Sequence, residues 1–250
     1  MTKGPQIRVG IGGWVFPPWR GVFYPPGLPQ ARELHFASRQ LTTIEINGTF
    51  YGAQSPASFR RWHDESPEDF VFSVKGPRFA THRPDLAGAG ETFDRFFSSG
   101  VLELRDKLGP ILWQFPPGAP ADERALAAFI ELLPDRVDGR SLRHAVELRR
   151  PKILTDRAAE LLRRRGVAFV VDDSRPDFAT TANFIYAHLR SCKLEEPAGY
   201  PPDALDAWAQ RLRERSASEA SDCFVYFISG AKVRAPAAAQ ALLQRLTPAA

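Results

Sequence analysis

Short apolar segments alternate with longer amphipathic segments along almost the whole chain. Eight apolar segments have the length and side-chain composition of buried strands: 7–13, 42–47, 70–75, 110–115, 143–149, 167–173, 184–190 and 223–229. Between them, apolar residues recur at helical spacing over about 30–39, 56–65, 91–108, 122–133, 155–165, 202–217 and 235–246. This alternation predicts parallel strands joined by helical crossovers.

Several predicted helices carry residues that favour helix ends at the expected boundaries. Ser55 is a good N-cap and precedes Pro56, which fits a first helical turn because no N–H donor is needed there. Thr155 and Asp156 open a later helix, and Gly166 follows its last turn. These residues support the boundaries independently of the apolar spacing.

Eight strands with intervening helices fit a (β/α)8 TIM barrel, and 250 residues is an ordinary length for one. We therefore predict a single α/β domain, a TIM barrel, over residues 1–250. The segment DSRPDFATTAN at 173–183 lacks a helical pattern, so we expect an irregular crossover between the sixth and seventh strands. A doubly wound open sheet is the alternative, but GIGGW at 10–14 does not match the Gly-rich phosphate loop usual in such folds.

The composition agrees with a folded globular domain, with 44% hydrophobic and 25% charged residues. No apolar run approaches the roughly 18–20 residues needed to span a membrane, and the N-terminus lacks the pattern of a signal peptide. The two cysteines, Cys192 and Cys223, lack the spacing of a disulfide framework or a zinc site. We therefore expect a cytoplasmic protein with no membrane partner.

The net charge of +4 and the pI near 9.3 give the chain a mild basic excess. Such an excess is compatible with an anionic ligand or with nucleic acid. It also arises from a GC-rich coding sequence without any function, and the basic residues are scattered instead of gathered in one stripe. The charge alone therefore assigns no partner.

Polar side chains recur on one face of the predicted strands, close to the end of each strand. Successive strand residues face opposite sides, so Ile44 and Ile46 facing the helices would turn Glu45 into the barrel. The same alternation in six neighbouring strands predicts that the inward polar residues are Glu45, Asn47, Lys75, Gln114, Glu147, Arg149, Asp172, His188 and Arg190. They would meet at the C-terminal mouth, where TIM-barrel enzymes place their active sites.

Two interpretations of this charged mouth stay open. In one, the charges satisfy each other, because unpaired buried charges are costly. Glu45 would then pair with Lys75, and Glu147 would pair with Arg149 or Arg190. In the other, which we favour because six strands contribute, the set holds a ligand. We then predict catalytic roles for Glu45, Lys75, Glu147 and Asp172, and ligand contacts for Asn47, Gln114, Arg149, His188 and Arg190.

Aromatic residues follow the first two predicted strands and would form a lip around the mouth. The segment GGWVFPPWRGVFYPPG at 12–27 carries several of them, and Phe50 and Tyr51 come after the second strand. Aromatic rings can stack on sugars or bases, but a proline-rich loop also needs large rings for its own packing. We predict ligand contact for Trp14, which is nearest to the strand end.

Five sequence blocks in about the first 150 residues resemble the YecE-like family, also called domain of unknown function 72. In this chain they read GGWVFPPWRGVFYPPG, TIEINGTFY, FVFSVKGPR, KLGPILWQFPP and AVELRRP. The resemblance extends from about residue 7 to about residue 246 and implies a single-domain TIM barrel of bacterial or archaeal cytoplasm, with no activity named. Its polar signature falls on Trp14, Glu45, Asn47, Tyr51, Lys75, Gln114, Glu147 and Arg149, which adds Tyr51 to the predicted ligand contacts.

The last third of the chain departs from that family pattern. The seventh strand of the family usually reads Arg-x-His-Gly, whereas this chain has HLRS at 188–191. The eighth strand usually ends in asparagines, whereas ISG stands at 228–230. A changed substrate and a decayed site would each account for these departures.

We therefore predict an enzyme that uses acid–base chemistry on a small anionic or polyhydroxylated substrate, such as a phosphate- or sugar-like molecule. One alternative is a nucleic-acid binding or processing protein, with Arg20, Arg78 and Arg83 contacting phosphates. Another is a non-catalytic protein that binds a small molecule. No motif predicts a cofactor. Three acids and His188 could hold a divalent metal, but Lys75 and two arginines would compete for the carboxylates, so no metal is predicted.

Overall fold

Nine short parallel strands form the wall of a barrel in the computed structural model, which describes residues 4–117, 119, 122–149, 155–177, 180–218 and 221–247. They are β1 (Ile7–Gly12), β2 (Thr43–Ile46), β3 (Val71–Lys75), β4 (Leu108–Gln114), β7 (His144–Glu147), β8 (Ala168–Phe169), β9 (Val171–Asp172), β10 (Phe184–Leu189) and β11 (Asp222–Phe227). Each predicted strand has a counterpart. The sixth, at 167–173, is divided into β8 and β9.

The barrel closes through this divided sixth strand. The hydrogen-bonded order is β8-β7-β4-β3-β2-β1-β11-β10-β9, so β8 and β9 lie at opposite ends of the sheet. β8 pairs with β7 and β9 pairs with β10, while Val170 between them donates its N–H to the Val146 carbonyl at 3.0 Å. One continuous segment therefore joins both ends of the sheet, and the predicted (β/α)8 barrel is confirmed.

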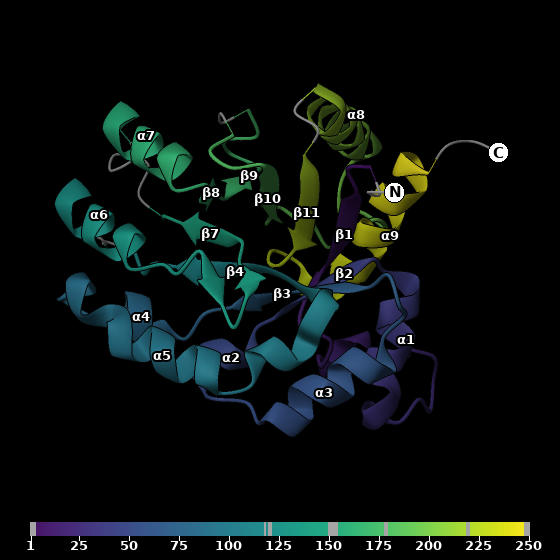
Figure 1. Ribbon diagram of the computed structural model, residues 1–250. Coiled ribbons are helices and arrows are strands. Elements are labelled where there is room, and N and C mark those ends of the chain that lie inside the picture. Colours follow the sequence, from purple (N-terminus) through teal and green to yellow (C-terminus); the bar gives the residue numbers. More distant parts are fainter. Residues whose placement is uncertain are drawn as a thin grey trace.

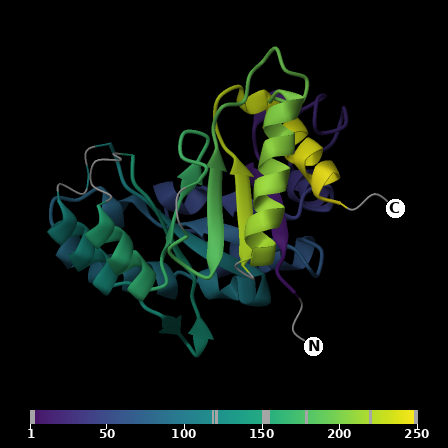
Figure 2. The same ribbon diagram turned by 90° about the horizontal axis from the view of Figure 1, so that it is seen from above.

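Helices surround the strands on the outside of the barrel, as Figures 1 and 2 show from two directions. The α-helices are α1 (Glu33–Gln40), α2 (Gly48–Tyr51), α3 (Pro56–Glu65), α4 (Arg78–Thr81), α5 (Gly90–Ser98), α6 (Glu123–Glu131), α7 (Asp156–Arg164), α8 (Pro202–Ser218) and α9 (Ala235–Leu246). Short 3-10 turns are η1 (Pro17–Trp19), η2 (Gln30–Arg32), η3 (Leu86–Ala89), η4 (Val101–Lys107) and η6 (Lys232–Arg234). Ser55 and Thr155 cap α3 and α7 as predicted, each accepting a backbone N–H three residues later.

The single helix predicted over 91–108 is wrong. Helix α5 ends at Ser98, and the 3-10 turn η4 begins at Val101 after Gly100, whose φ is +102°. This left-handed backbone suits glycine, and a Cβ at Gly100 would lie 2.7 Å from the Pro56 Cα. The apolar spacing continues across the break, so periodicity alone could not locate it.

A small hairpin between α6 and β7 was also not predicted. Strands β5 (Arg136–Val137) and β6 (Arg140–Ser141) pair antiparallel, and Asp138 and Gly139 between them have φ of +48° and +75°. An Asp-Gly pair between strand residues is a strong signal for such a two-residue turn. The sequence VDGR at 137–140 therefore indicates this hairpin.

The crossover between β9 and β10 is irregular, as predicted. Within the described residues 173–177 and 180–183, no helix forms. The short helices α2 and α4, which follow β2 and β3 directly, were not predicted because about one turn is too short to show a period. In the described part of the chain, no helix is both long and apolar enough to span a bilayer.

Two apolar layers fill the space inside and outside the strand wall. The outer layer lies between strands and helices and includes Ile44, Ile46, Phe72 and Val74. The inner layer consists of Val71, Leu112, Ala145, Ala168, Val170, Phe184, Tyr186, Phe224 and Tyr226. The predicted strand faces are therefore correct.

The inner layer is also partly polar. The Tyr226 hydroxyl contacts the hydroxyls of Ser73 at 2.5 Å and Thr43 at 2.9 Å. Gly10 of β1 adds no side chain there, because a Cβ would lie 1.8 Å from the Thr43 carbonyl oxygen. Large tyrosine rings from β10 and β11 therefore fill the barrel below the mouth.

Candidate ligand site at the barrel mouth

Three buried polar side chains from different strands meet inside the C-terminal mouth. Glu45 of β2, Glu147 of β7 and His188 of β10 are 1%, 4% and 1% exposed. His188 Nε2 lies 2.7 Å from Glu45 Oε2, and His188 Nδ1 lies 3.1 Å from Glu147 Oε2. One imidazole thus bridges two carboxylates across the barrel, and we call this set the bridged triad.

Further side chains hold each carboxylate of the bridged triad. The Tyr186 hydroxyl donates to Glu45 Oε2 at 2.6 Å, and Gln114 Nε2 donates to Glu147 Oε2 at 2.7 Å. Arg190 Nη2 donates to Glu147 Oε1, and Arg149 Nε lies 3.8 Å from the same oxygen. Buried carboxylates need such donors, so the orientation of both acids is fixed.

The electrostatics of Glu45 follow from these contacts. Burial raises the pKa of Glu45, but the charge and hydrogen bond of His188, with Lys75 and the Tyr186 hydroxyl, outweigh it and lower the pKa to about 2. Both ring nitrogens of His188 face carboxylate oxygens, which accept hydrogen bonds and do not donate them when ionised. Each ring nitrogen thus has a carboxylate oxygen as its hydrogen-bond partner.

Lys75 at the end of β3 has a different environment. Its Nζ lies 4.5 Å from the centre of the Phe50 ring, and within the described residues it makes no hydrogen bond or ion pair. Burial lowers the pKa of Lys75, Glu45 opposes this, and the charges of Arg149 and Arg190 lower it further. The expected ion pair between Glu45 and Lys75 is thus not formed, since Glu45 contacts His188 and Tyr186 instead.

Cations gather on the same side of the mouth. They include Arg78, Lys75 and Arg149, whose charges add to the effect of burial in lowering the pKa of His82 and so favour its neutral form. Arg190 adds to the group, and its buried Nε has no hydrogen-bond partner in the described structure. The mouth therefore combines a paired acidic centre with a positive rim.

A pocket of about 430 Å³ lies at the carboxyl ends of β1 and β2. It is lined by Gly12, Gly13, Trp14, Val15, Ile46, Asn47, Gly48, Tyr51, Gln54, Trp62 and Lys232. Gly12 pairs with Glu45 in the sheet register, and the Gly13 N–H donates to the Glu45 backbone carbonyl at 2.9 Å, so the pocket lies next to the backbone of Glu45, while the triad side chains do not line it. The structure thus places Trp14, Asn47 and Tyr51 together along one pocket.

Asp172 is not brought into the bridged triad. Its Oδ1 accepts from the Ser174 N–H at 2.9 Å and the Ser174 hydroxyl at 2.5 Å, and Oδ2 lies 3.9 Å from Arg175 Nη2. The carboxylate therefore stabilises the turn after β9. The set of three acids and His188 that we weighed as a metal site does not converge, and the described residues contain no other cluster suited to a metal ion.

Sequence reasoning missed four residues of the mouth. Tyr186 shares the inward face of His188, but an aromatic residue in a strand is typical of a core, so only this shared face could have indicated a contact with Glu45. Trp62, His82 and Lys232 come from helices or loops, where strand alternation gives no information. The aromatic lip also serves its own packing, because Trp19 and Tyr24 are buried.

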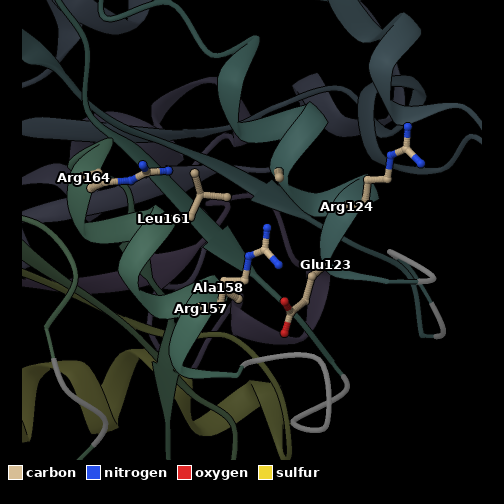
Figure 3. A pocket seen from close by; sticks show the side chains of 7 residues that line it. Glu123, Arg124, Arg157, Ala158, Leu161 and Arg164 are labelled. Atoms are coloured by element: carbon tan, nitrogen blue, oxygen red, sulfur yellow. The ribbon is translucent and has the colours of Figure 1, made fainter.

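A second pocket, of about 460 Å³, lies on the outer wall between α6 and α7. Figure 3 shows its side chains, which are Glu123, Arg124, Ala127, Arg157, Ala158, Leu161 and Arg164. Glu123 accepts a hydrogen bond from Thr155, whereas the three arginines make no ion pair within the described residues. This outer pocket contains no predicted site residue and no buried acid.

The fold and the mouth define the class: a (β/α)8 barrel with a bridged triad and a positive rim at its C-terminal end. The sequence model of the family described as "Protein of unknown function DUF72" matches residues 8–250, so the chain belongs to this family. The family resemblance of the five sequence blocks is thereby confirmed.

Two curated relatives share part of this sequence. The UPF0759 protein YecE of Escherichia coli K12 is 27% identical over 177 residues, which cover 68% of this chain and 60% of that protein. The UPF0759 protein YunF of Bacillus subtilis is 31% identical over 117 residues, 45% of this chain and 40% of that protein. The chain thus spans less than two thirds of the length of the relatives that it matches.

Solved structures agree with the barrel. A DUF72 family protein of Thermotoga maritima superposes with a TM-score of 0.73 at 25% identity, covering 95% of this chain and 97% of that one. A DUF72 family protein of Enterococcus faecalis gives 0.71 at 16% identity, covering 98% and 97%. A xylose isomerase-like TIM barrel/4-hydroxyphenylpyruvate dioxygenase fusion protein gives 0.56 at 15% identity over 98% of this chain and 42% of that one, which shows the fold alone.

Proposed function

We propose that this chain is an enzyme that acts on a small anionic substrate at the barrel mouth by acid–base chemistry. The observation that carries the proposal is the bridged triad, in which His188 contacts the buried carboxylates of Glu45 and Glu147 at 2.7 and 3.1 Å. Coupled groups of this kind can take up and release a proton while each charge keeps a partner. Tyr186 and Gln114 orient the two carboxylates in this proposal.

An anionic substrate is supported by donors that the protein leaves unsatisfied. Lys75 Nζ makes no hydrogen bond or ion pair within the described residues, and the buried Arg190 Nε has no partner there. Arg149 is 43% exposed and lies only at 3.8 Å from Glu147 Oε1. A carboxylate or phosphate group would accept hydrogen bonds from these cations. Its negative charge would also offset the repulsion between the cations.

The pocket at the ends of β1 and β2 supports a ring-shaped or hydroxylated body for the same substrate. Trp14 packs edge-on against Trp62 with ring centres 5.2 Å apart, and Asn47 adds a side-chain amide to the pocket lining. Aromatic surfaces bind the apolar faces of sugars, and amides bind their hydroxyls. The volume of about 430 Å³ suits a small molecule. A sugar phosphate or a hydroxylated acid combines both features.

The proposal is tested by a ligand screen followed by a turnover assay. Thermal shift with sugar phosphates, hydroxy acids and the matching neutral sugars is expected to select anionic compounds, and turnover of the selected compounds is followed by NMR. E147Q is expected to abolish turnover while binding persists. Turnover that E147Q leaves unchanged would contradict the role of the triad, and binding without any turnover in the wild type would indicate a non-catalytic binding protein.

Nucleic-acid binding is the second candidate, and the outer pocket favours it. Arg124, Arg157 and Arg164 line a groove between two helices without ion-pair partners in the described structure. Arginines that contact phosphates make affinity fall steeply with salt. Of the arginines predicted for this role, Arg20 is engaged with Glu33 and Gln30. If the affinity for single-stranded DNA does not change with salt, the arginines do not contact its phosphates, and this function is excluded.

A further inference from the structure

Lys75 lies at the mouth, but the acid–base chemistry proposed for the bridged triad gives it no proton to transfer. Its backbone is fixed, because the Lys75 carbonyl accepts a hydrogen bond from the Thr49 hydroxyl at 2.6 Å. Its side chain ends 4.5 Å from the centre of the Phe50 ring, and Phe50 is buried. The amine therefore sits at a defined place, partly enclosed, with no hydrogen-bond acceptor among the described residues.

The neighbours of Lys75 disfavour its charged form. Burial lowers the pKa of the amine, Glu45 opposes this, and Arg149 and Arg190 lower it again. A lysine beside other cations and partly removed from water has a larger neutral fraction, and the neutral amine is the nucleophile. Glu45 does not quench it by direct pairing, because its Oε2 contacts Tyr186 and His188.

We propose that Lys75 is a catalytic nucleophile that forms an imine with a small carbonyl compound carrying a carboxylate or phosphate. This inference rests on the proposed function, since it needs an anionic group bound at the positive rim. Arg149 and Arg190 would hold that group and place the carbonyl beside the amine. The bridged triad lies one strand away through Glu45 and supplies and accepts the protons.

The step balances without an oxidant or a reductant. The lone pair of the neutral Nζ attacks the carbonyl carbon, and the π electron pair moves to oxygen, which takes up a proton. Loss of a proton from nitrogen gives a carbinolamine. Its hydroxyl then takes up a proton and leaves as water while the C=N bond forms, and nitrogen releases its second proton. One amine and one carbonyl thus give one imine and one water.

Borohydride trapping tests the inference without knowledge of the natural substrate. The full-length protein is incubated with pyruvate, glyoxylate or dihydroxyacetone phosphate, sodium borohydride reduces any imine to a stable amine, and mass spectrometry locates the label. We expect label on Lys75 with at least one probe, and complete loss of the label at this position in K75R, which keeps the charge but has no free amine. The exposed Lys193 gives the matched control K193R, which is expected to label like the wild type.

The outcomes separate this inference from the proposed function. Wild-type protein that gives no label with any of the three probes overturns the imine, and so does label that maps to Lys232 or spreads over surface lysines. Binding of inorganic phosphate, measured by calorimetry on the same wild-type sample, tests the anion site separately. Phosphate binding without label leaves the proposed function standing and removes the nucleophile, whereas absence of both removes the anion site as well.

Discussion

The hydrogen bonds around Glu45 make this residue a source of pH-dependent stability. Its pKa is about 2 in the folded protein against an ordinary value of 4.5, so folding favours the ionised form. A lowered folded pKa stabilises the protein above the unfolded pKa, and this stabilisation is lost as the pH falls from about 4.5 towards 2.

We expect E45Q to lose this component. At pH 7 the substitution leaves His188 and Tyr186 without their ionic partner and is expected to cost roughly 2–4 kcal/mol of unfolding free energy. The difference from the wild type should shrink as the pH falls from about 4.5 towards 2, because the unfolded chain takes up a proton at Glu45 in this range while the folded protein keeps the carboxylate ionised. Urea denaturation at pH 7 and pH 3 measures both values, and an equal difference at the two pH values would contradict the ionised network.

A substitution of Tyr186 tests whether its hydrogen bond lowers the pKa of Glu45. Y186F removes the 2.6 Å hydrogen bond to Glu45 Oε2, which favours the ionised form, so the pKa of Glu45 is expected to rise. The acid-induced loss of stability should therefore be smaller and should end at a higher pH than in the wild type, with a cost of about 1–2 kcal/mol at pH 7. Y226F, which removes a hydroxyl bonded to Ser73 and Thr43, is the matched control and should leave the lower end of this pH range nearer to the wild-type value.

At the residue scale, the sequence was most informative where a side chain belongs to a strand. Strand alternation correctly turned Glu45, Glu147 and His188 into the barrel, because successive side chains must face opposite sides. It gave no sign that the Asp172 carboxylate would stay apart from the triad, because a local turn binds that carboxylate through Ser174. Which charges pair with each other depends on distances across the barrel, and alternation contains no such distances.

At the scale of single elements, the break between α5 and η4 depends on one glycine. Gly100 has a φ of +102°, and a Cβ there would lie 2.7 Å from the Pro56 Cα at the start of α3. The apolar spacing that predicted one helix over 91–108 was real, since Phe96, Phe97 and Leu104 are all buried. The spacing of apolar residues indicates which side chains are buried. It does not indicate that the helix breaks at Gly100, because that break depends on a contact with Pro56 of another helix.

We expect G100A to destabilise the protein by roughly 2 kcal/mol or more, because alanine is strained at positive φ and its methyl group meets backbone atoms. Gly90 provides the control: it begins α5 with a φ of −52°, and a Cβ there meets nothing within 4 Å. G90A is therefore expected to be neutral or to stabilise by up to about 1 kcal/mol. Urea unfolding compares the two variants, and equal effects would argue against strain at Gly100.

At the scale of the whole molecule, the fold was predictable because every strand needs two covered faces. Eight apolar segments separated by amphipathic ones can satisfy this in a closed barrel, and the continuous segment 168–172 closes it by pairing with β7 and β10. The same logic places the strand ends together at one mouth. It does not choose a ligand, because the rim and the pocket also draw on loops and helices, as Trp62 and His82 show.

The positive rim of the mouth and the arginines of the outer pocket lie in different parts of the molecule, so their ligands can be separated by paired substitutions. R149A removes a cation from the rim and is expected to weaken phosphate binding about tenfold or more, since a charge-assisted hydrogen bond is lost. R157A changes the outer pocket between α6 and α7 and should leave phosphate binding unchanged while weakening any binding of single-stranded DNA. Calorimetry with phosphate and fluorescence anisotropy with a labelled oligonucleotide measure the two effects. If R157A weakened phosphate binding as much as R149A, the anion site would belong to the outer wall, and the mouth would lose its main support as the site of chemistry.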